Sequence, residues 1–249
     1  QHNISAMSDT IASMTGNKVR RLPFGYVFTS EDIMPDPSSK GATIKALNRM
    51  VENKRLSKLS RGKYFKPEKT PFGELMPSQG EALKDLLLDR GKPIGYLTGL
   101  SIYNRLGLTA QVSNVIQIGR NDGRTRFSRN QYSIKITRQK NRITKENIPL
   151  LQVLDVLRSL KNIPDSEPQK SIQILTSMIS RLDKKRLKTL VRLALKYPPS
   201  TRALLGAIFD AIDETELAVG LSVSLNPITT YKIPGAVEAL PKSSKWHLR

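Results

Sequence analysis

The chain has 249 residues and a formal net charge of +20, with 41 Lys and Arg against 21 Asp and Glu. It has no cysteine, which excludes disulfides, cysteine zinc sites and thiol nucleophiles, and its two histidines, His2 and His247, lie near the ends. No apolar run approaches the length of a membrane span. A positive charge this large favours a polyanionic partner, above all nucleic acid.

The positive charge is concentrated in two regions separated by an acidic one. Residues 1–70 carry 13 basic and 6 acidic side chains, residues 71–89 carry 1 and 4, and residues 90–145 carry 12 and 1. We therefore predict a DNA-binding domain over 1–70, a basic α/β domain over 71–145, and a mainly helical region with an extended tail over 146–249.

The first 70 residues predict a winged helix-turn-helix. A tight hairpin at Ser60-Arg61-Gly62 separates two short strands, and Pro35 ends the short helix that precedes the longest one. The predicted elements are a helix over 5–18, a strand over 26–28, a short helix from Ser30, a helix over 39–53, and strands over 55–59 and 63–66.

The long helix of this domain is the candidate for entry into the major groove of DNA. Ile44, Leu47 and Val51 share its apolar face, which leaves small and basic side chains outward. Asn can bond adenine and Arg guanine. The residues predicted to contact bases are Lys40, Thr43, Lys45, Asn48 and Arg49, and those predicted to hold phosphates from the wing are Lys58, Arg61 and Lys63. The alternative is a protein-binding winged helix with solvated lysines.

The middle region predicts a mixed α/β domain. We expect a helix over 78–90, an extended segment over 93–97, a helix over 98–105, and strands over 112–118 and 132–137 that flank a loop over 119–129. Its basic residues form a possible second basic surface: Arg120, Arg124, Arg126, Arg129, Lys135, Arg138, Lys140 and Arg142. This surface suits DNA, an acidic protein or simple solvation, and the sequence leaves all three open.

The C-terminal region predicts a helical bundle. Helices are expected over 148–161, 169–181, 183–196 and 202–212, and the stretch after about residue 217 is expected to form strands or an extended tail packed on the body. The fold class is therefore α+β.

Several segments resemble the AbiEi-type antitoxins of type IV toxin–antitoxin systems, and specifically a basic branch of that family. The likeness covers about residues 10–210. The segments that carry it are 25–29 (GYVFT), 46–51 (ALNRMV), 59–65 (LSRGKYF), 70–75 (TPFGEL), 95–99 (GYLTG), 106–112 (LGLTAQV) and 193–206 (LALKYPPSTRALLG). The resemblance implies a winged-helix antitoxin that represses its own operon and opposes a nucleotidyltransferase-like toxin without stable binding to it.

A search for enzyme chemistry finds no phosphate-binding loop and no dinucleotide fingerprint. Pro35-Asp36 with Glu52 and Lys54 imitates a magnesium nuclease pattern, as does Pro164-Asp165 with Asp183 and Lys185, but both fall on predicted helices and breaks rather than adjoining strands. We therefore expect no catalytic residue, no metal and no cofactor.

The predicted function is that of a cytoplasmic, non-enzymatic autorepressor that binds double-stranded DNA at its own promoter and acts as the antitoxin of an abortive-infection (phage-defence) system. The alternative is an adaptor whose basic surface binds an acidic protein partner or toxin. RNA binding is a weaker interpretation, because few aromatic side chains are available for base stacking.

Overall fold

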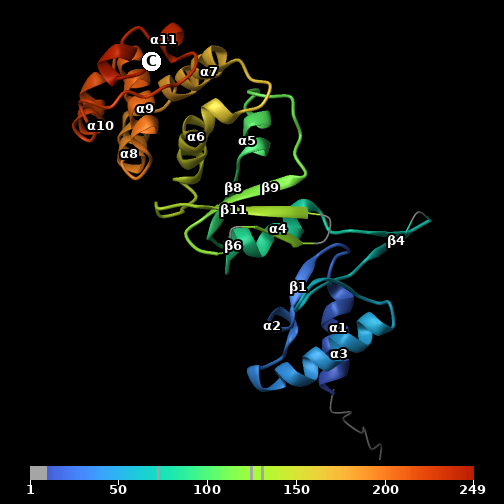
Figure 1. Ribbon diagram of the computed structural model, residues 1–249. Helices are drawn as coiled ribbons and strands as arrows, with labels where there is room; N and C mark the ends of the chain where they lie inside the picture. Colours follow the sequence, from blue (N-terminus) through green and yellow to red (C-terminus); the bar gives the residue numbers. More distant parts are fainter. Residues whose placement is uncertain (1–9, 72, 124–125, 130–131) are drawn as a thin grey trace, which may run out of the picture. The chain divides into compact units, whose positions relative to one another are not determined.

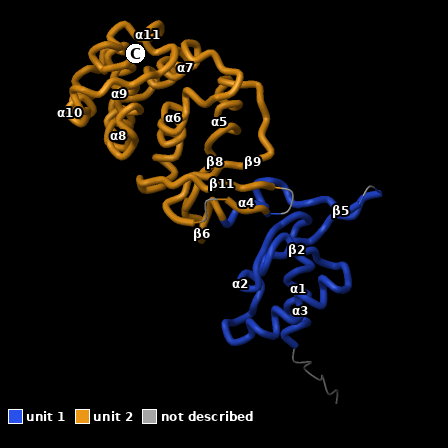
Figure 2. Tube along the Cα trace, in the orientation of Figure 1, with its two compact units in different colours: residues 1–85, 129–131 blue, residues 86–128, 132–249 orange. Residues whose placement is uncertain are grey.

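The computed structural model describes residues 10–71, 73–123, 126–129 and 132–249, and it is an α+β protein (Figure 1). The chain divides into two compact units (Figure 2). The first unit comprises the residues up to Asp85 together with Arg129, and the second comprises the other described residues from Leu86 onward. The predicted segments 71–145 and 146–249 fall largely within the second unit.

The first unit follows the predicted element order through its third strand. Its sheet has the strand order β1-β3-β2 and is antiparallel, with Phe28 and Lys58 both opposite Tyr64. The elements are α1 (Ile11–Arg21), β1 (Val27–Thr29), α2 (Ser30–Ile33), the 3-10 turn η1 (Pro37–Ser39), α3 (Lys40–Glu52), β2 (Ser57–Ser60), β3 (Lys63–Phe65), β4 (Glu68–Thr70), β5 (Gly73–Leu75) and α4 (Gln79–Leu87).

Local chemistry explains where these elements begin. The Thr10 side chain accepts a hydrogen bond from the backbone N–H of Ser13 and caps α1, while residues 5–9 of the predicted helix lie outside the described residues. Asp36 caps η1 and its pKa is lowered by the hydrogen bond from the Ser38 hydroxyl. The β4–β5 hairpin was not predicted from the sequence.

The core of the first unit is small. Its buried side chains come from α1, α2, α3 and the sheet: Val19, Phe28, Ile33, Leu47, Leu56 and Tyr64. The Phe28 and Tyr64 rings stack with centroids 6.1 Å apart. This core fixes α3 against the sheet, and therefore decides which side of α3 faces outward.

The second unit combines a four-stranded sheet with helices. The sheet order is β10-β11-β9-β8, with β11 parallel and β8 antiparallel to β9. The elements are β6 (Leu88–Asp89), β7 (Lys92–Pro93), β8 (Gly95–Thr98), α5 (Leu100–Arg105), β9 (Val115–Arg120), β10 (Arg126–Arg129), β11 (Tyr132–Arg138), α6 (Ile148–Ser159), η2 (Leu160–Asn162), α7 (Pro168–Ser180), α8 (Lys184–Ala194), α9 (Pro199–Ala211), η3 (Thr215–Ala218), α10 (Val219–Val223), α11 (Ala236–Ala239) and η4 (Ser243–Trp246).

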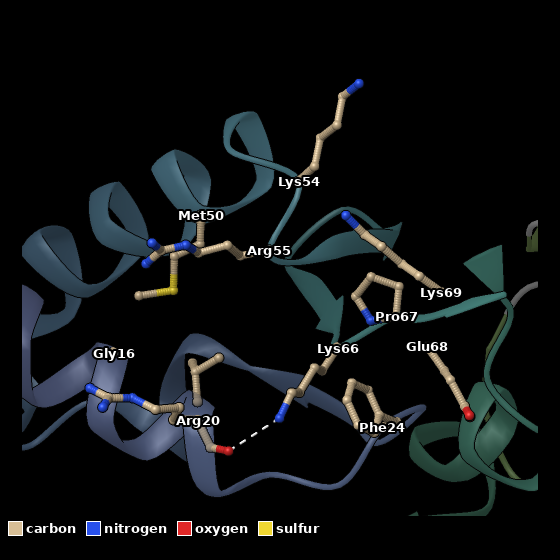
Figure 3. Close-up of a pocket in the computed structure, with 11 residues that line it drawn as sticks. Gly16, Arg20, Phe24, Met50, Lys54, Arg55, Lys66, Pro67, Glu68 and Lys69 are labelled. Carbon is tan, nitrogen blue, oxygen red and sulfur yellow. Dashed lines mark hydrogen bonds between the residues drawn. The ribbon is translucent and has the colours of Figure 1, made fainter. Parts of the chain in front are cut away.

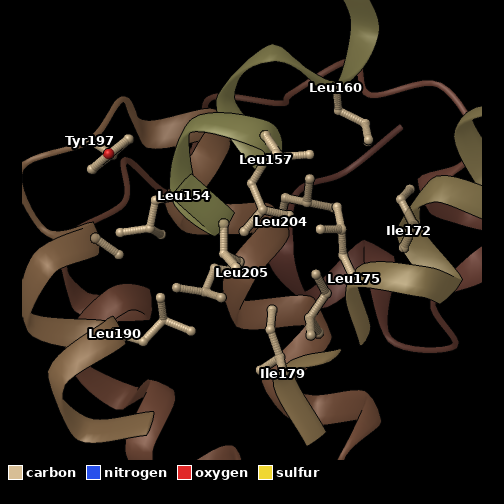
Figure 4. Packing of buried hydrophobic residues seen from close by; sticks show 14 of the residues in the cluster. Leu154, Leu157, Leu160, Ile172, Leu175, Ile179, Leu190, Tyr197, Leu204 and Leu205 are labelled. Carbon is tan, nitrogen blue, oxygen red and sulfur yellow. The ribbon is translucent and has the colours of Figure 1, made fainter. Parts of the chain in front are cut away.

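One hydrophobic core joins the sheet region to the helices. Tyr96 of β8 and Ile102 of α5 belong to the same buried cluster as Leu154 of α6 and Leu204 of α9. Figure 4 shows the helical part of this cluster, where Leu154 and Leu204 lie among side chains of α7 and α8. The predicted boundary at 145/146 therefore does not separate two cores. The predicted loop over 119–129 is also wrong at its end, because residues 126–129 form β10, which pairs with β11.

A buried polar network sits where β8 meets α6. The Asp155 carboxylate is 1 % exposed. It accepts hydrogen bonds from the hydroxyls of Tyr96 (2.7 Å), Thr98 (2.8 Å) and Tyr197 (2.9 Å), and the Arg158 guanidinium pairs with it at 3.0 Å. Burial and the Asp155 charge raise the pKa of both tyrosines. A buried carboxylate with this many donors holds the sheet to the helices.

The C-terminal tail packs on the helices, as predicted, but as short helical turns rather than strands. Trp246 is 2 % exposed and its indole N–H donates to Asp210 Oδ2 of α9 at 2.8 Å. Lys245 pairs with the same oxygen at 2.8 Å. The Trp246 ring lies against Gly206, where a side chain larger than hydrogen has no room. The tail therefore completes the core of the second unit.

Candidate nucleic-acid interface

The orientation of α3 is set by three buried residues: Thr43, Ala46 and Leu47. Its exposed positions are Lys40, Gly41, Ala42, Lys45, Arg49 and Glu52. The prediction that Thr43 reaches a base is therefore wrong: Thr43 is fully buried, four residues before Leu47 and thus on the same side of the helix. Leu47 of the predicted apolar face is buried and Met50 and Val51 pack against the same core, but the fully buried face extends to Thr43 rather than to Ile44, which is half-buried.

Two of the cations predicted to contact bases are exposed on this face of α3 and free to bind another molecule. Lys45 and Arg49 are exposed, lie one turn apart, and form no ion pair within the described part of the chain. Lys40 is exposed but paired with Glu31 at 2.8 Å. Asn48 is half-buried, and its amide oxygen accepts a hydrogen bond from the Tyr64 hydroxyl at 3.2 Å. Lys45 and Arg49 are thus the side chains best placed to meet another molecule.

The β2–β3 hairpin carries Lys58 and Arg61 in exposed positions, with Gly62 at φ +75° closing the turn. Lys63 is different. It forms an ion pair with Asp85 of α4, and Arg129 pairs with the same carboxylate at 2.5 Å. The prediction that Lys63 holds a phosphate is therefore corrected, because Asp85 already neutralises it.

Asp85 is a local anchor of the first unit. Its burial acts against ionisation, yet the hydrogen bonds and charges of Arg129 and Lys63 lower its pKa below the ordinary value. Arg129 is 7 % exposed and also donates to the carbonyl of Ala82 at 2.8 Å. Arg129 therefore does not belong to a second basic surface, contrary to the prediction.

Within the second unit the predicted basic residues divide into two groups. Arg120 turns inward: it pairs with Asp122 at 2.9 Å and donates to the carbonyl of Leu86 at 3.4 Å. Arg124 lies outside the described residues. The exposed members are Arg126, Lys135, Arg138, Lys140 and Arg142.

Helix α8 adds cations that the sequence analysis did not assign to this surface. Lys185, Arg186, Lys188 and Arg192 are exposed, because the leucines between them are buried. Lys196, just after α8, donates to the carbonyl of Lys140 at 3.3 Å, which brings the end of α8 beside the 138–142 segment. The helical spacing of Leu187, Leu190 and Leu193 could have predicted that these cations face outward.

A groove in the first unit was not predicted at all. Its larger part, about 880 Å³, is lined by α1, the end of α3 and the β3–β4 segment (Figure 3). A second part of about 600 Å³ continues along α1 and α3 and shares four residues with the first: Gly16, Arg20, Met50 and Arg55. We call the two parts together the α1–α3 groove. Its cations come from segments far apart in the sequence, so no local pattern could reveal it.

In the described parts of the chain, no group of three or more His, Asp or Glu side chains is arranged to hold a metal ion. None of the helices in those parts is both long and apolar enough to cross a bilayer.

Comparison with known families shows which family the chain belongs to. Residues 15–187 match the model of a family of unknown function, DUF6088, and the chain belongs to this family. No curated protein matches it. Among solved structures it is similar to the RV2827C protein from Mycobacterium tuberculosis, with a TM-score of 0.56 and 13 % identity over 95 % of this chain and 90 % of that one. At that identity the likeness concerns the fold.

Proposed function

We propose that the first unit is a winged helix-turn-helix that binds double-stranded DNA, and that the protein is a binding protein without a catalytic role. The observation that carries the proposal is the placement of unpaired cations: Lys45 and Arg49 on the outward face of α3, and Lys58 and Arg61 on the adjoining hairpin. A helix with small and basic outward residues fits the major groove, and a basic hairpin tip fits the flanking phosphates.

The two sets of cations have different roles in this proposal. Arg49 reads base edges, since a guanidinium can bond guanine in bidentate fashion, with Lys45 one turn away and Asn48 at its side. Lys58 and Arg61 neutralise phosphates irrespective of sequence. The exposed Gly41 and Ala42 near the start of α3 let the helix backbone approach the groove closely.

We further propose, from the resemblance to AbiEi-type antitoxins, that the DNA is the promoter of the protein's own operon and that the protein acts in the cytoplasm as an antitoxin against a nucleotidyltransferase-like toxin. The formal charge of +20 supports a polyanionic ligand but does not choose between DNA sequences.

The test is fluorescence anisotropy with a labelled duplex from upstream of the gene and a scrambled duplex of equal length, each at several salt concentrations. We expect at least hundredfold tighter binding to the promoter, equivalent to about 2.7 kcal/mol. Arg49→Ala should reduce this preference, whereas Arg61→Ala should weaken both duplexes alike and reduce the salt slope by about 1. Equal binding of both duplexes by the unaltered protein would refute sequence-specific recognition.

A further inference from the structure

The α1–α3 groove combines an apolar floor with a cationic rim. Val19, Met50, Phe24 and Pro67 provide the floor. The cations that line it are Arg20, Arg49, Lys54, Arg55, Lys66 and Lys69, and the lining residues of its two parts include a single carboxylate, Glu68. In Figure 3, Met50 and Phe24 lie among the charged side chains of the larger part: Arg20, Lys54, Arg55, Lys66, Glu68 and Lys69.

Most of the rim cations are not used by the fold itself. Lys66 is an exception, because its ammonium donates to the carbonyls of Arg20 and Leu22 at the end of α1 and lies 4.5 Å from the centre of the Phe24 ring. Arg20 donates to Asn17 within α1. Arg49, Lys54, Arg55 and Lys69 are exposed and form no ion pair within the described residues. These four cations share the groove with a single carboxylate, Glu68, so the rim carries an excess of positive charge that an anionic ligand would neutralise.

The shape of the groove indicates a chain rather than a compact molecule. Its lining runs from Thr10 at the start of α1 to Phe24 beyond its end, and α1 has 11 residues, a length of about 16 Å at 1.5 Å per residue. An extended peptide rises about 3.3 Å per residue, so this length suits about five residues.

The floor favours a peptide over a nucleic-acid strand. Binding of single strands relies on flat aromatic faces on which bases stack. Phe24 is the only aromatic side chain that lines the groove among the described residues, and Lys66 already lies over its ring. Met50 offers flexible, non-aromatic surface, which suits an aliphatic or aromatic side chain of a peptide.

We propose that the α1–α3 groove binds an acidic peptide segment of a partner protein. Its carboxylates pair with Arg49, Arg55, Lys54 and Lys69, and one apolar side chain packs on Met50 and Phe24. Arg49 also belongs to the face that we propose for DNA, so peptide and DNA would compete for it. Only this competition rests on the proposed function; the peptide site does not.

The site is tested by selecting peptides from a displayed library of random ten-residue segments on the full chain, and then measuring the fluorescence polarisation of a selected peptide. We expect enrichment of sequences with at least three acidic residues around an apolar one. Arg55→Gln should weaken binding roughly tenfold, and Phe24→Ala severalfold. Glu68→Gln should strengthen it, an effect that general damage to the fold would not produce.

The matched control is Lys58→Gln, which removes the same charge from the same unit outside the groove and should leave peptide affinity within about twofold. No enrichment, or equal binding by Arg55→Gln, would overturn the proposal. Short single-stranded DNA or nucleotides that bind through Arg55 while acidic peptides do not would also overturn it. Peptide binding without displacement of promoter DNA would leave the site intact and refute the competition alone.

Discussion

Replacing Gly206 by Ala should destabilise the second unit, although glycine is ordinarily the poorer helix residue. Gly206 lies within α9, where alanine would normally gain about 1 kcal/mol. Here a Cβ would lie 2.1 Å from the Trp246 ring, far inside van der Waals contact. The ring cannot simply shift, because it is buried and its N–H is bound to Asp210.

The size of the effect follows from these opposing contributions. Overpacking a core costs about 1–3 kcal/mol, and complete loss of a buried Trp costs about 3–5 kcal/mol. Because the ring cannot simply shift, we expect a cost between these two bounds, about 2–4 kcal/mol. After the helix gain of about 1 kcal/mol is subtracted, the expected net loss is about 1–3 kcal/mol, or on the order of 5 °C in the melting temperature. Trp246 is the only tryptophan in the chain, so its fluorescence in a urea titration reports on unfolding of the second unit.

The matched control is Gly220→Ala in α10, where the added Cβ meets no atom within 4 Å. That variant should be as stable as the parent or slightly more stable. In a Trp246→Leu background, followed by circular dichroism, the Gly206→Ala penalty should largely disappear. A Gly206→Ala protein with an unchanged or raised urea midpoint would refute the argument that the tail is locked against α9.

Three further predictions concern polar groups that are buried or partly buried. Thr43→Val should leave DNA affinity unchanged and raise stability by about 1 kcal/mol, since the buried Thr43 hydroxyl has no hydrogen-bond partner among the described residues; weaker DNA binding in the anisotropy assay would show that Thr43 does belong to the interface. Tyr197→Phe should lower stability by about 1–2 kcal/mol, because Asp155 and Gln139 each lose a hydrogen-bond partner; an unchanged urea midpoint in Trp246 fluorescence would contradict this. Asp85→Asn should destabilise the first unit at neutral pH, and the difference from the parent should shrink as the pH falls below about 4, because a lowered folded-state pKa contributes stability only while the carboxylate is ionised. Hydrogen exchange of β3 peptides at several pH values measures this last difference, and a difference that does not depend on pH would exclude an electrostatic origin.

The order of elements in the first unit through β3 could be predicted from the sequence, because local signals define it, whereas the β4–β5 and β6–β7 pairs and β10 were not predicted. Proline and glycine mark the ends of the early helices, and the Arg61-Gly62 turn marks the β2–β3 hairpin. The rotation of α3 about its axis could not be predicted as well. Thr43 and Ile44 are neighbours and both β-branched, and the apolar pattern favours burial of the larger Ile44, whereas packing in the core of the first unit buries Thr43 instead.

The same limit applies to the number of cores. The acidic stretch 71–89 marks the change between units closely, because the first unit ends at Asp85. No comparable change in the sign of the charge marks residue 145, yet we predicted a boundary there, where the second basic stretch ends. Tyr96 and Gln139 reach Asp155 and Tyr197 across that position, and such long-range hydrogen bonds leave no local signal.

The charge count shows why sites are harder to predict than folds. A sequence gives the number of cations but not their partners, and the partners of Lys63 and Arg129 lie 22 and 44 residues away at Asp85. Those two cations stabilise the fold and are not available to bind a ligand. Arg55 and Lys69 form no ion pair among the described residues, and they line the α1–α3 groove, which was not predicted from the sequence. A polyanion senses the summed field of all these charges, but a specific site needs cations whose own neighbours leave them unneutralised. The residues to mutate are therefore the exposed, unpaired ones, Arg49 and Arg55 first, rather than those in the densest basic runs.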